Sequence, residues 1–151
     1  MLNRFLQEGW LTELKTLVLY YSYSGKTKKV AEKAAEQNNA DIVEVKEPVK
    51  RSTISAYVKG SLAARKQKKF ELLPIDCDLS QYDRIILAAP IWFGFPAPPM
   101  NNMIDMLPHG KEVLLILTSG SGKSTGSAEK TKQLVQNRGC SVIKYKDVAG
   151  H

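Results

Sequence analysis

Apolar runs and helically spaced segments alternate along this 151-residue chain. Nearly continuous apolar runs at 15–21, 84–89 and 111–118 are typical of parallel strands that are covered on both faces. Two further β-branched stretches, at 41–45 and 141–146, mix charged residues among the apolar ones, as edge strands do. The pattern therefore predicts five strands, of which the second and the last lie at the edges.

Between these strands, apolar residues recur at helical spacing. The intervals 26–38, 53–66, 98–107 and 127–138 each place several of them on one face. Right-handed crossovers then build an open parallel sheet with helices on both faces. The expected fold is a three-layer, doubly wound five-stranded α/β sheet with strand order 2-1-3-4-5.

The segment after the first strand combines hydroxyl groups, one glycine and a lysine at the point where a helix begins. It consists of Ser22, Tyr23, Ser24, Gly25, Lys26 and Thr27. Free N–H groups at a helix N-terminus attract anions, and glycine lets the backbone approach a ligand closely. The turn therefore predicts a phosphate site, although an ordinary capped helix is the alternative interpretation.

A second candidate segment follows the third predicted strand and carries two large aromatic residues. It consists of Pro90, Ile91, Trp92, Phe93 and Gly94. The ligand crevice of a doubly wound sheet lies where the strand order reverses, so this segment and the 22–27 turn should meet there. Exposed aromatic rings are unfavourable unless they cover a flat ligand, although they could instead pack on the helix that follows. Together the two segments indicate a phosphorylated aromatic ligand.

Composition narrows the class of protein. Apolar residues make up 43% of the chain and charged residues 25%, which is typical of soluble globular proteins. No apolar run approaches the roughly 20 residues of a membrane helix, and no secretion signal is evident, so we expect a cytoplasmic protein without membrane insertion. Cys77 and Cys140 lack metal-binding spacing and are expected to be reduced thiols.

The net charge of +7 is concentrated largely between residues 46 and 69. No nucleic-acid recognition motif accompanies these charges, so we expect a solvated basic face, with an acidic partner as the alternative. A P-loop hydrolase is disfavoured. Tyr20 and Leu117 stand five positions before Gly25 and Gly122, where that motif requires glycine.

The two candidate segments resemble those of the flavodoxin family. The 22–27 turn is similar to the family's (S/T)-x-(S/T)-G-x-T phosphate loop, and 82–99 is similar to its strand and isoalloxazine loop. A third stretch, Ser119, Gly120 and Ser121, stands where a further flavin-contacting loop follows the fourth strand. The resemblance covers about residues 15–146 and implies FMN as the cofactor.

The resemblance implies a role in FMN binding for each of the three segments. Residues 22–27 would hold the phosphate of FMN, 90–94 would wrap the ring system with Trp92 or Phe93 stacked on it, and 119–121 would touch the pyrimidine side. Redox chemistry then belongs to the flavin, and neither a catalytic side chain nor a metal is expected. The implied function is that of a single-electron carrier, a monomer or weak dimer that meets a redox partner protein or reductase.

Two other functions remain open within this resemblance: an NAD(P)H-dependent quinone or small-molecule reductase, and a binding or regulatory module that holds no flavin. Three features depart from the family pattern. Lys26 stands where the family commonly has Asn, the net charge is positive where the family's carriers are typically acidic, and 119–121 lacks the usual acidic and aromatic residues.

The two ends of the chain depart from the family as well. Only residues 147–151 follow the fifth predicted strand, too few for the helix that the family has there. Residues 1–14 precede the domain at 15–151 and place apolar side chains near helical spacing: Leu2, Phe5, Leu6, Trp10 and Leu14. We expect this amphipathic helix to fill the vacant position, as in a circular permutation, and a disordered tail is the alternative.

Overall fold

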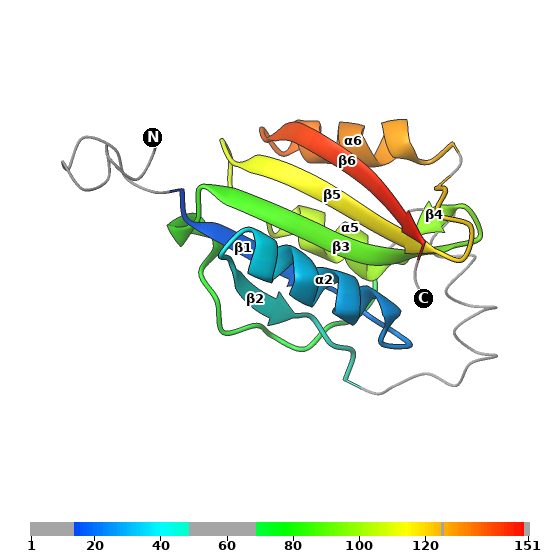
Figure 1. The fold of residues 1–151 in the computed structure, drawn as a ribbon. Coiled ribbons are helices and arrows are strands. Elements are labelled where there is room, and N and C mark those ends of the chain that lie inside the picture. The colour runs from blue at the N-terminus through cyan, green and yellow to red at the C-terminus, as the bar shows by residue number, and fades with distance from the viewer. Residues whose placement is uncertain (1–13, 49–68, 125, 150–151) are drawn as a thin grey trace.

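A computed structural model describes residues 14–48, 69–124 and 126–149 of the protein. Five strands form a parallel sheet in the order β2-β1-β3-β5-β6 (Figure 1), which confirms the predicted 2-1-3-4-5 order of main strands. Their bounds are Thr16–Tyr20 for β1, Asp41–Glu44 for β2, Arg84–Trp92 for β3, Glu112–Ser119 for β5 and Ser141–Ala149 for β6.

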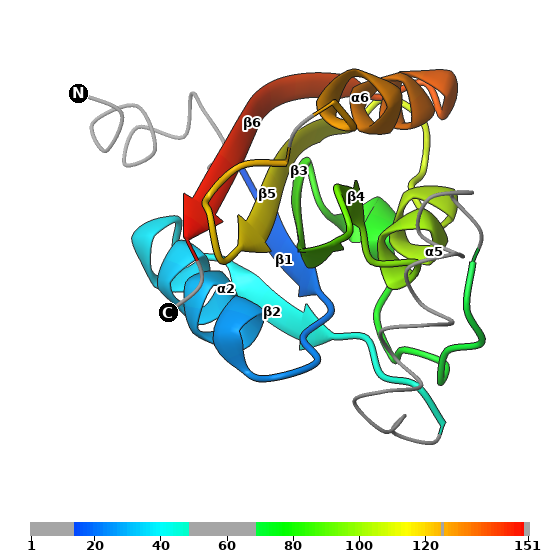
Figure 2. The same ribbon diagram turned by 90° about the vertical axis from the view of Figure 1, so that its right-hand side faces the viewer.

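Three α-helices in the described residues cover the two faces of this sheet. They are α2 at Lys26–Gln37, α5 at Pro99–Asp105 and α6 at Ala128–Asn137, and Leu79–Gln81 forms a short 3₁₀ turn. Figure 2 shows α2 on one side of the sheet and α5 with α6 on the other. The domain therefore has the three layers that the alternating pattern predicts.

Alternate residues of the buried strands supply two separate cores. Leu17, Leu19, Ile85 and Leu87 face α5 and α6, whereas their neighbours on the same strands face α2. The second set includes Val18, Tyr20, Ile86 and Ala88, packed on three alanines of α2. Continuous apolar runs are needed because both faces of each central strand are buried.

The predicted boundary after the third strand is wrong. Residues 90–96 were expected to be a loop, but β3 continues to Trp92 and pairs antiparallel with a short strand, β4, at Phe95–Pro96. The turn between them has φ values of 50° at Phe93 and 83° at Gly94. Positive φ at both central residues is the geometry that joins two tightly paired strands, so a proline-containing run forms a hairpin here.

The last strand is also longer than predicted, since it reaches Ala149 rather than residue 146. A register shift after Val113 pairs Leu114 with Lys144 and leaves Ile143 as the extra residue. This irregularity turns Lys144 and Lys146 toward the α2 side of the sheet. There a groove of about 410 Å³ lies between α2 and β6.

Two predicted helices, at 53–66 and at 1–14, fall on residues outside the described ranges, apart from Leu14. The flanks of the first are close together, because the Leu73 N–H donates a 2.7 Å hydrogen bond to the Lys46 carbonyl. None of the helices in the described ranges is long and apolar enough to cross a membrane.

Candidate functional site

The turn after β1 is closed by its own first hydroxyl group. Ser22 Oγ accepts a hydrogen bond of 3.0 Å from the Gly25 N–H. Gly25 then starts α2 with φ of 96°, a left-handed conformation that favours glycine, and a Cβ at this position would meet no atom within 4 Å. The backbone at Gly25 is therefore open to a ligand.

The N-terminal end of α2 is positively charged and uncapped. No side chain caps this end, and its first turn contains no acidic residue. Lys26, Lys28 and Lys29 occupy it instead, and all three are exposed. Because a helix N-terminus already carries partial positive charge, lysines there are unfavourable unless an anion binds. The local electrostatics suit a phosphate group.

Thr27 makes a contact that the sequence did not reveal. Its side chain is 2% exposed, and its Oγ1 lies 2.7 Å from Oγ1 of Thr118, which is 3% exposed and lies near the end of β5. The sequence predicts that the Thr27 hydroxyl serves the phosphate. In the structure this hydroxyl joins the 22–27 turn to the carboxyl end of β5, next to the third candidate loop.

The sequence predicts that the turn and the hairpin meet, and in the structure they do so through contacts between aromatic rings, which the sequence does not predict. Trp92 contacts Tyr23 with ring centroids 6.0 Å apart and Tyr21 at 6.1 Å, both nearly perpendicular. Phe70, from a stretch in which the sequence showed no signal, lies 6.5 Å from Trp92. Four aromatic residues from three segments therefore gather where the strand order reverses.

The aromatic residue at the hairpin tip differs from its neighbour. Phe93 is 62% exposed and has positive φ, whereas Trp92 is partly buried among the other rings. An exposed phenylalanine leaves apolar area in water, and its left-handed backbone costs about 1–2 kcal/mol. Gly94 and Ile91 complete the hairpin, and Pro90 lies beside Thr118 in the sheet.

A cavity of about 370 Å³ adjoins the turn on its β2 side. It is lined by Tyr21, Ser22, Tyr23, Ser24, Gly25, Lys28 and residues 44–47. Tyr21 Oη donates a 2.8 Å hydrogen bond to Glu47 at its rim. The hairpin contributes none of the residues that line this cavity, so the cavity adjoins the 22–27 turn but not the hairpin.

The third predicted loop begins at the same edge of the sheet but folds on itself. The Lys123 N–H donates to Ser119 Oγ at 3.1 Å and to Ser121 Oγ at 3.3 Å, and Gly120 is exposed. Tyr145 Oη donates to Ser124 Oγ at 2.6 Å and ties the loop to β6. The two predicted serines are thus engaged within their own loop.

The buried Tyr20 and the partly buried Tyr145 stay protonated at neutral pH. Burial, followed by the nearby Glu44 carboxylate, raises the pKa of Tyr20 to about 12. Burial likewise raises the pKa of Tyr145. Their hydroxyl groups therefore act as hydrogen-bond donors near the site, not as bases.

Comparison with known proteins agrees with this architecture. A family model described as flavodoxin matches residues 15–147. No curated protein matches the chain. Among solved structures, a flavoprotein in complex with FMN from Lactobacillus acidophilus NCFM is 30% identical, with a TM-score of 0.69 over 91% of this chain and 93% of that one.

Two further structures show the same fold. The apo-form of the flavoprotein from Lactobacillus acidophilus NCFM is 29% identical, with a TM-score of 0.65 over 91% of this chain and 95% of that one. A putative flavoprotein from Bacteroides eggerthii DSM 20697 has a TM-score of 0.78 at 19% identity, over 91% and 89% of the two chains. With the family model spanning most of the sequence, the chain belongs to the flavodoxin family.

Proposed function

We propose that this protein binds FMN at the carboxyl edge of the sheet and works as a single-electron carrier. Residues 22–27 would hold the phosphate, and residues 90–94 would hold the ring system. When bound, the flavin supplies the redox chemistry, while the protein binds it, orients it and limits its contact with water.

One observation supports the phosphate assignment: the first turn of α2 carries lysines where acidic residues are favoured. Lys26, Lys28 and Lys29 stand in the first turn, where acidic residues are favoured, and no side chain caps that turn. These residues make the free protein less stable and make a bound dianion more stable. The FMN complex of the related Lactobacillus acidophilus flavoprotein supports a phosphorylated flavin as that anion.

The ring assignment rests on the hairpin. Phe93 combines exposure of 62% with positive φ, two unfavourable features that a flat ligand would offset by covering the ring. Trp92 precedes Phe93 in the chain, and its contact with Tyr23 brings the hairpin to the 22–27 turn. A ligand with a phosphate at one end and a flat aromatic ring at the other fits this arrangement.

The first test is titration of the flavin-free protein with FMN and, in parallel, with riboflavin, which lacks the phosphate. We expect FMN fluorescence to be quenched at a stoichiometry of one. Because phosphate hydrogen bonds to a charged group contribute about 1.5–3 kcal/mol each, riboflavin should bind at least about tenfold more weakly. Equal affinity for the two ligands would contradict the phosphate assignment, and no binding of either would contradict the cofactor.

A second experiment separates the carrier from a reductase. The FMN-loaded protein is mixed with NADPH alone in a stopped-flow instrument, and the flavin absorbance is followed. We expect slow bleaching with NADPH and rapid bleaching when a one-electron donor is added. Rapid bleaching by NADPH alone would assign a reductase instead. The charge of +7 favours a redox partner with an acidic surface.

A further inference from the structure

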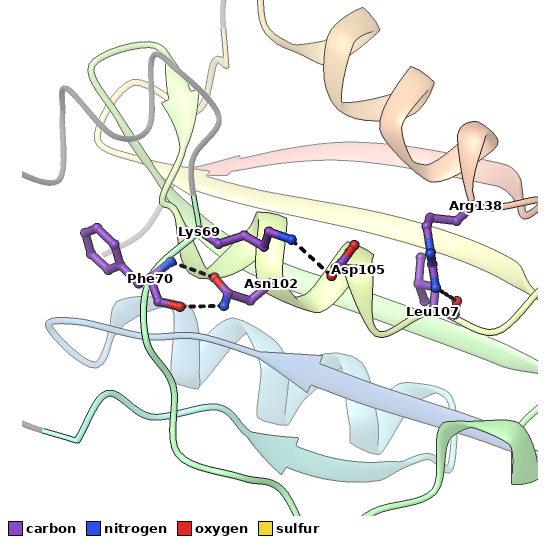
Figure 3. A network of polar contacts seen from close by, with 6 residues as sticks. All are labelled: Lys69, Phe70, Asn102, Asp105, Leu107 and Arg138. Atoms are coloured by element: carbon purple, nitrogen blue, oxygen red, sulfur yellow. Dashed lines mark hydrogen bonds and ion pairs between the residues drawn. The ribbon is translucent and has the colours of Figure 1, made fainter.

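One side chain of α5 holds the backbone of Phe70, which lies near the start of the second described range, 69–124. Asn102 Oδ1 accepts a 2.9 Å hydrogen bond from the Phe70 N–H, and its Nδ2 donates a 2.6 Å bond to the Phe70 carbonyl (Figure 3). The amide thus pairs with both backbone groups of one residue, as a neighbouring strand would. This contact fixes both the position and the direction of the backbone at Phe70.

The fixed backbone directs the Phe70 ring to the candidate site. Its centroid lies 6.5 Å from that of Trp92, with the planes tilted by 55°. Tyr21 and Tyr23 contact the same indole ring from the turn after β1. Trp92 is therefore in contact with rings from two other segments, of which one is set by Asn102.

We infer that Phe70 is a further residue of the site that binds the flat ring of a flavin, and that Asn102 is the positioning residue that holds it there. This inference rests on the proposed function, because it assumes that the ring system lies at the hairpin. Phe70 stabilises the orientation of Trp92, and Asn102 acts only through Phe70.

The neighbouring ion pair between Lys69 and Asp105 cannot hold Phe70 in place. Lys69 Nζ lies 3.1 Å from Asp105 Oδ2, one helical turn beyond Asn102 (Figure 3), but the side chains are 55% and 58% exposed. Exposed ion pairs contribute little and fix no geometry. Asparagine is also a poor helix former, so its presence inside α5 indicates a role that alanine would not fill.

The binding test uses two ligands: FMN, and lumiflavin, which keeps the ring system but lacks the ribityl phosphate. The variants are Asn102→Ala and Phe70→Leu. An aromatic contact of ordinary strength corresponds to about a three- to tenfold change in affinity. We expect both variants to bind FMN and lumiflavin more weakly than the parent by this factor, because the two ligands share the same ring system.

Two matched variants complete the series. Asp105→Asn removes the exposed ion pair from the same helix and should leave both affinities within about twofold of the parent. Asn102→Asp keeps the acceptor for the Phe70 N–H but loses the donor to its carbonyl. It should give an intermediate affinity. Far-UV circular dichroism and the urea midpoint of each variant confirm that it is folded.

A second readout needs no flavin. In a Trp10→Phe background, Trp92 is the only tryptophan, so the emission and its quenching by acrylamide report on the surroundings of Trp92 alone. Asn102→Ala and Phe70→Leu should both shift the emission to longer wavelength and increase quenching. Asp105→Asn should change neither.

The outcomes distinguish this inference from the proposed function. If the parent binds neither FMN nor lumiflavin, both are wrong. If the parent binds FMN but Asn102→Ala binds lumiflavin as tightly as the parent does, only the inference is wrong. A loss confined to FMN would also overturn it, because the effect would then act on the phosphate and not on the ring.

Discussion

At the scale of single residues, the site contains features that make the free protein less stable than it could be. Three lysines stand at the positive end of α2, and Phe93 combines exposure with a left-handed backbone. Such conflicts between local preference and structure concentrate at functional sites, because a ligand offsets them. They lead to the expectation that stability and ligand affinity change in opposite directions.

Lys26→Glu tests that expectation at the phosphate turn. An acidic residue in the first turn of a helix contributes about 0.3–1 kcal/mol at low salt, so the flavin-free variant should be more stable in urea than the parent. The gain should shrink in high salt. FMN affinity should fall by tenfold or more, measured by fluorescence titration.

The matched control is Lys33→Glu, which changes the net charge equally but lies almost two turns into the helix. It should leave the affinity for FMN nearly unchanged. If both variants weaken FMN binding to the same extent, the effect comes from the overall charge of the protein and not from the end of α2.

At the scale of elements, the sequence predicts the sheet better than the hairpin. Buried strands and amphipathic helices leave periodic patterns, so β1, β5, α2 and α6 were located to within a few residues. The hairpin that ends in β4 leaves no such pattern, because its two short arms include Pro90 and Pro96. A proline is usually a sign that a strand has ended.

The hairpin turn provides the next prediction. Gly94→Ala places a Cβ at φ of 83° and should lower the free energy of unfolding by about 1–2 kcal/mol. Phe93→Asn creates the Asn-Gly pair that such turns favour, so it should raise the free energy of unfolding by up to about 1 kcal/mol. Urea denaturation of the flavin-free variants measures both effects.

Flavin titration of the same two variants separates structure from binding. Phe93→Asn should weaken FMN binding although the fold is more stable. A variant that is more stable and binds FMN as tightly as the parent would show that the Phe93 ring does not cover the ligand.

At the scale of the whole molecule, the sequence predicts the strand order and which loops meet, but not which side chains join them. Tyr23 and Trp92 could be placed together because both lie at the carboxyl ends of neighbouring strands. The pairs Thr27 with Thr118 and Phe70 with Asn102 are 91 and 32 residues apart. Their contacts depend on the packing of α2 and α5 on the sheet, which no local pattern encodes.

Stability at high pH is a property of the whole fold, because two buried tyrosines, Tyr20 and Tyr82, and the partly buried Tyr145 contribute to it. The pKa of Tyr20 is raised to about 12 by burial and then by Glu44, that of Tyr82 is raised chiefly by its hydrogen bond to Asp41, and that of Tyr145 is raised by burial. A tyrosine whose pKa is raised in the folded state stabilises the protein, and this stabilisation is fully present at pH values below the unfolded-state pKa near 10. That stabilisation is lost as the pH rises from about 10 to 12.

We therefore expect the urea midpoint of the parent protein to decrease when the pH is raised from 9 to 11. The urea midpoint of Tyr20→Phe should decrease less. Far-UV circular dichroism at the two pH values measures the difference. Equal losses in the parent and in Tyr20→Phe would show that Tyr20 ionises in the folded protein as easily as in the unfolded one.

The hydrogen bond between the Lys46 carbonyl and the Leu73 N–H has a consequence for engineering. Lys46 and Leu73 lie on either side of residues 49–68 in the sequence, and their backbones are joined by this 2.7 Å contact. A guest domain whose own termini lie close together could be inserted between Lys46 and Leu73 without disrupting the sheet. The two junctions of such an insertion would stay joined by a backbone hydrogen bond of the domain.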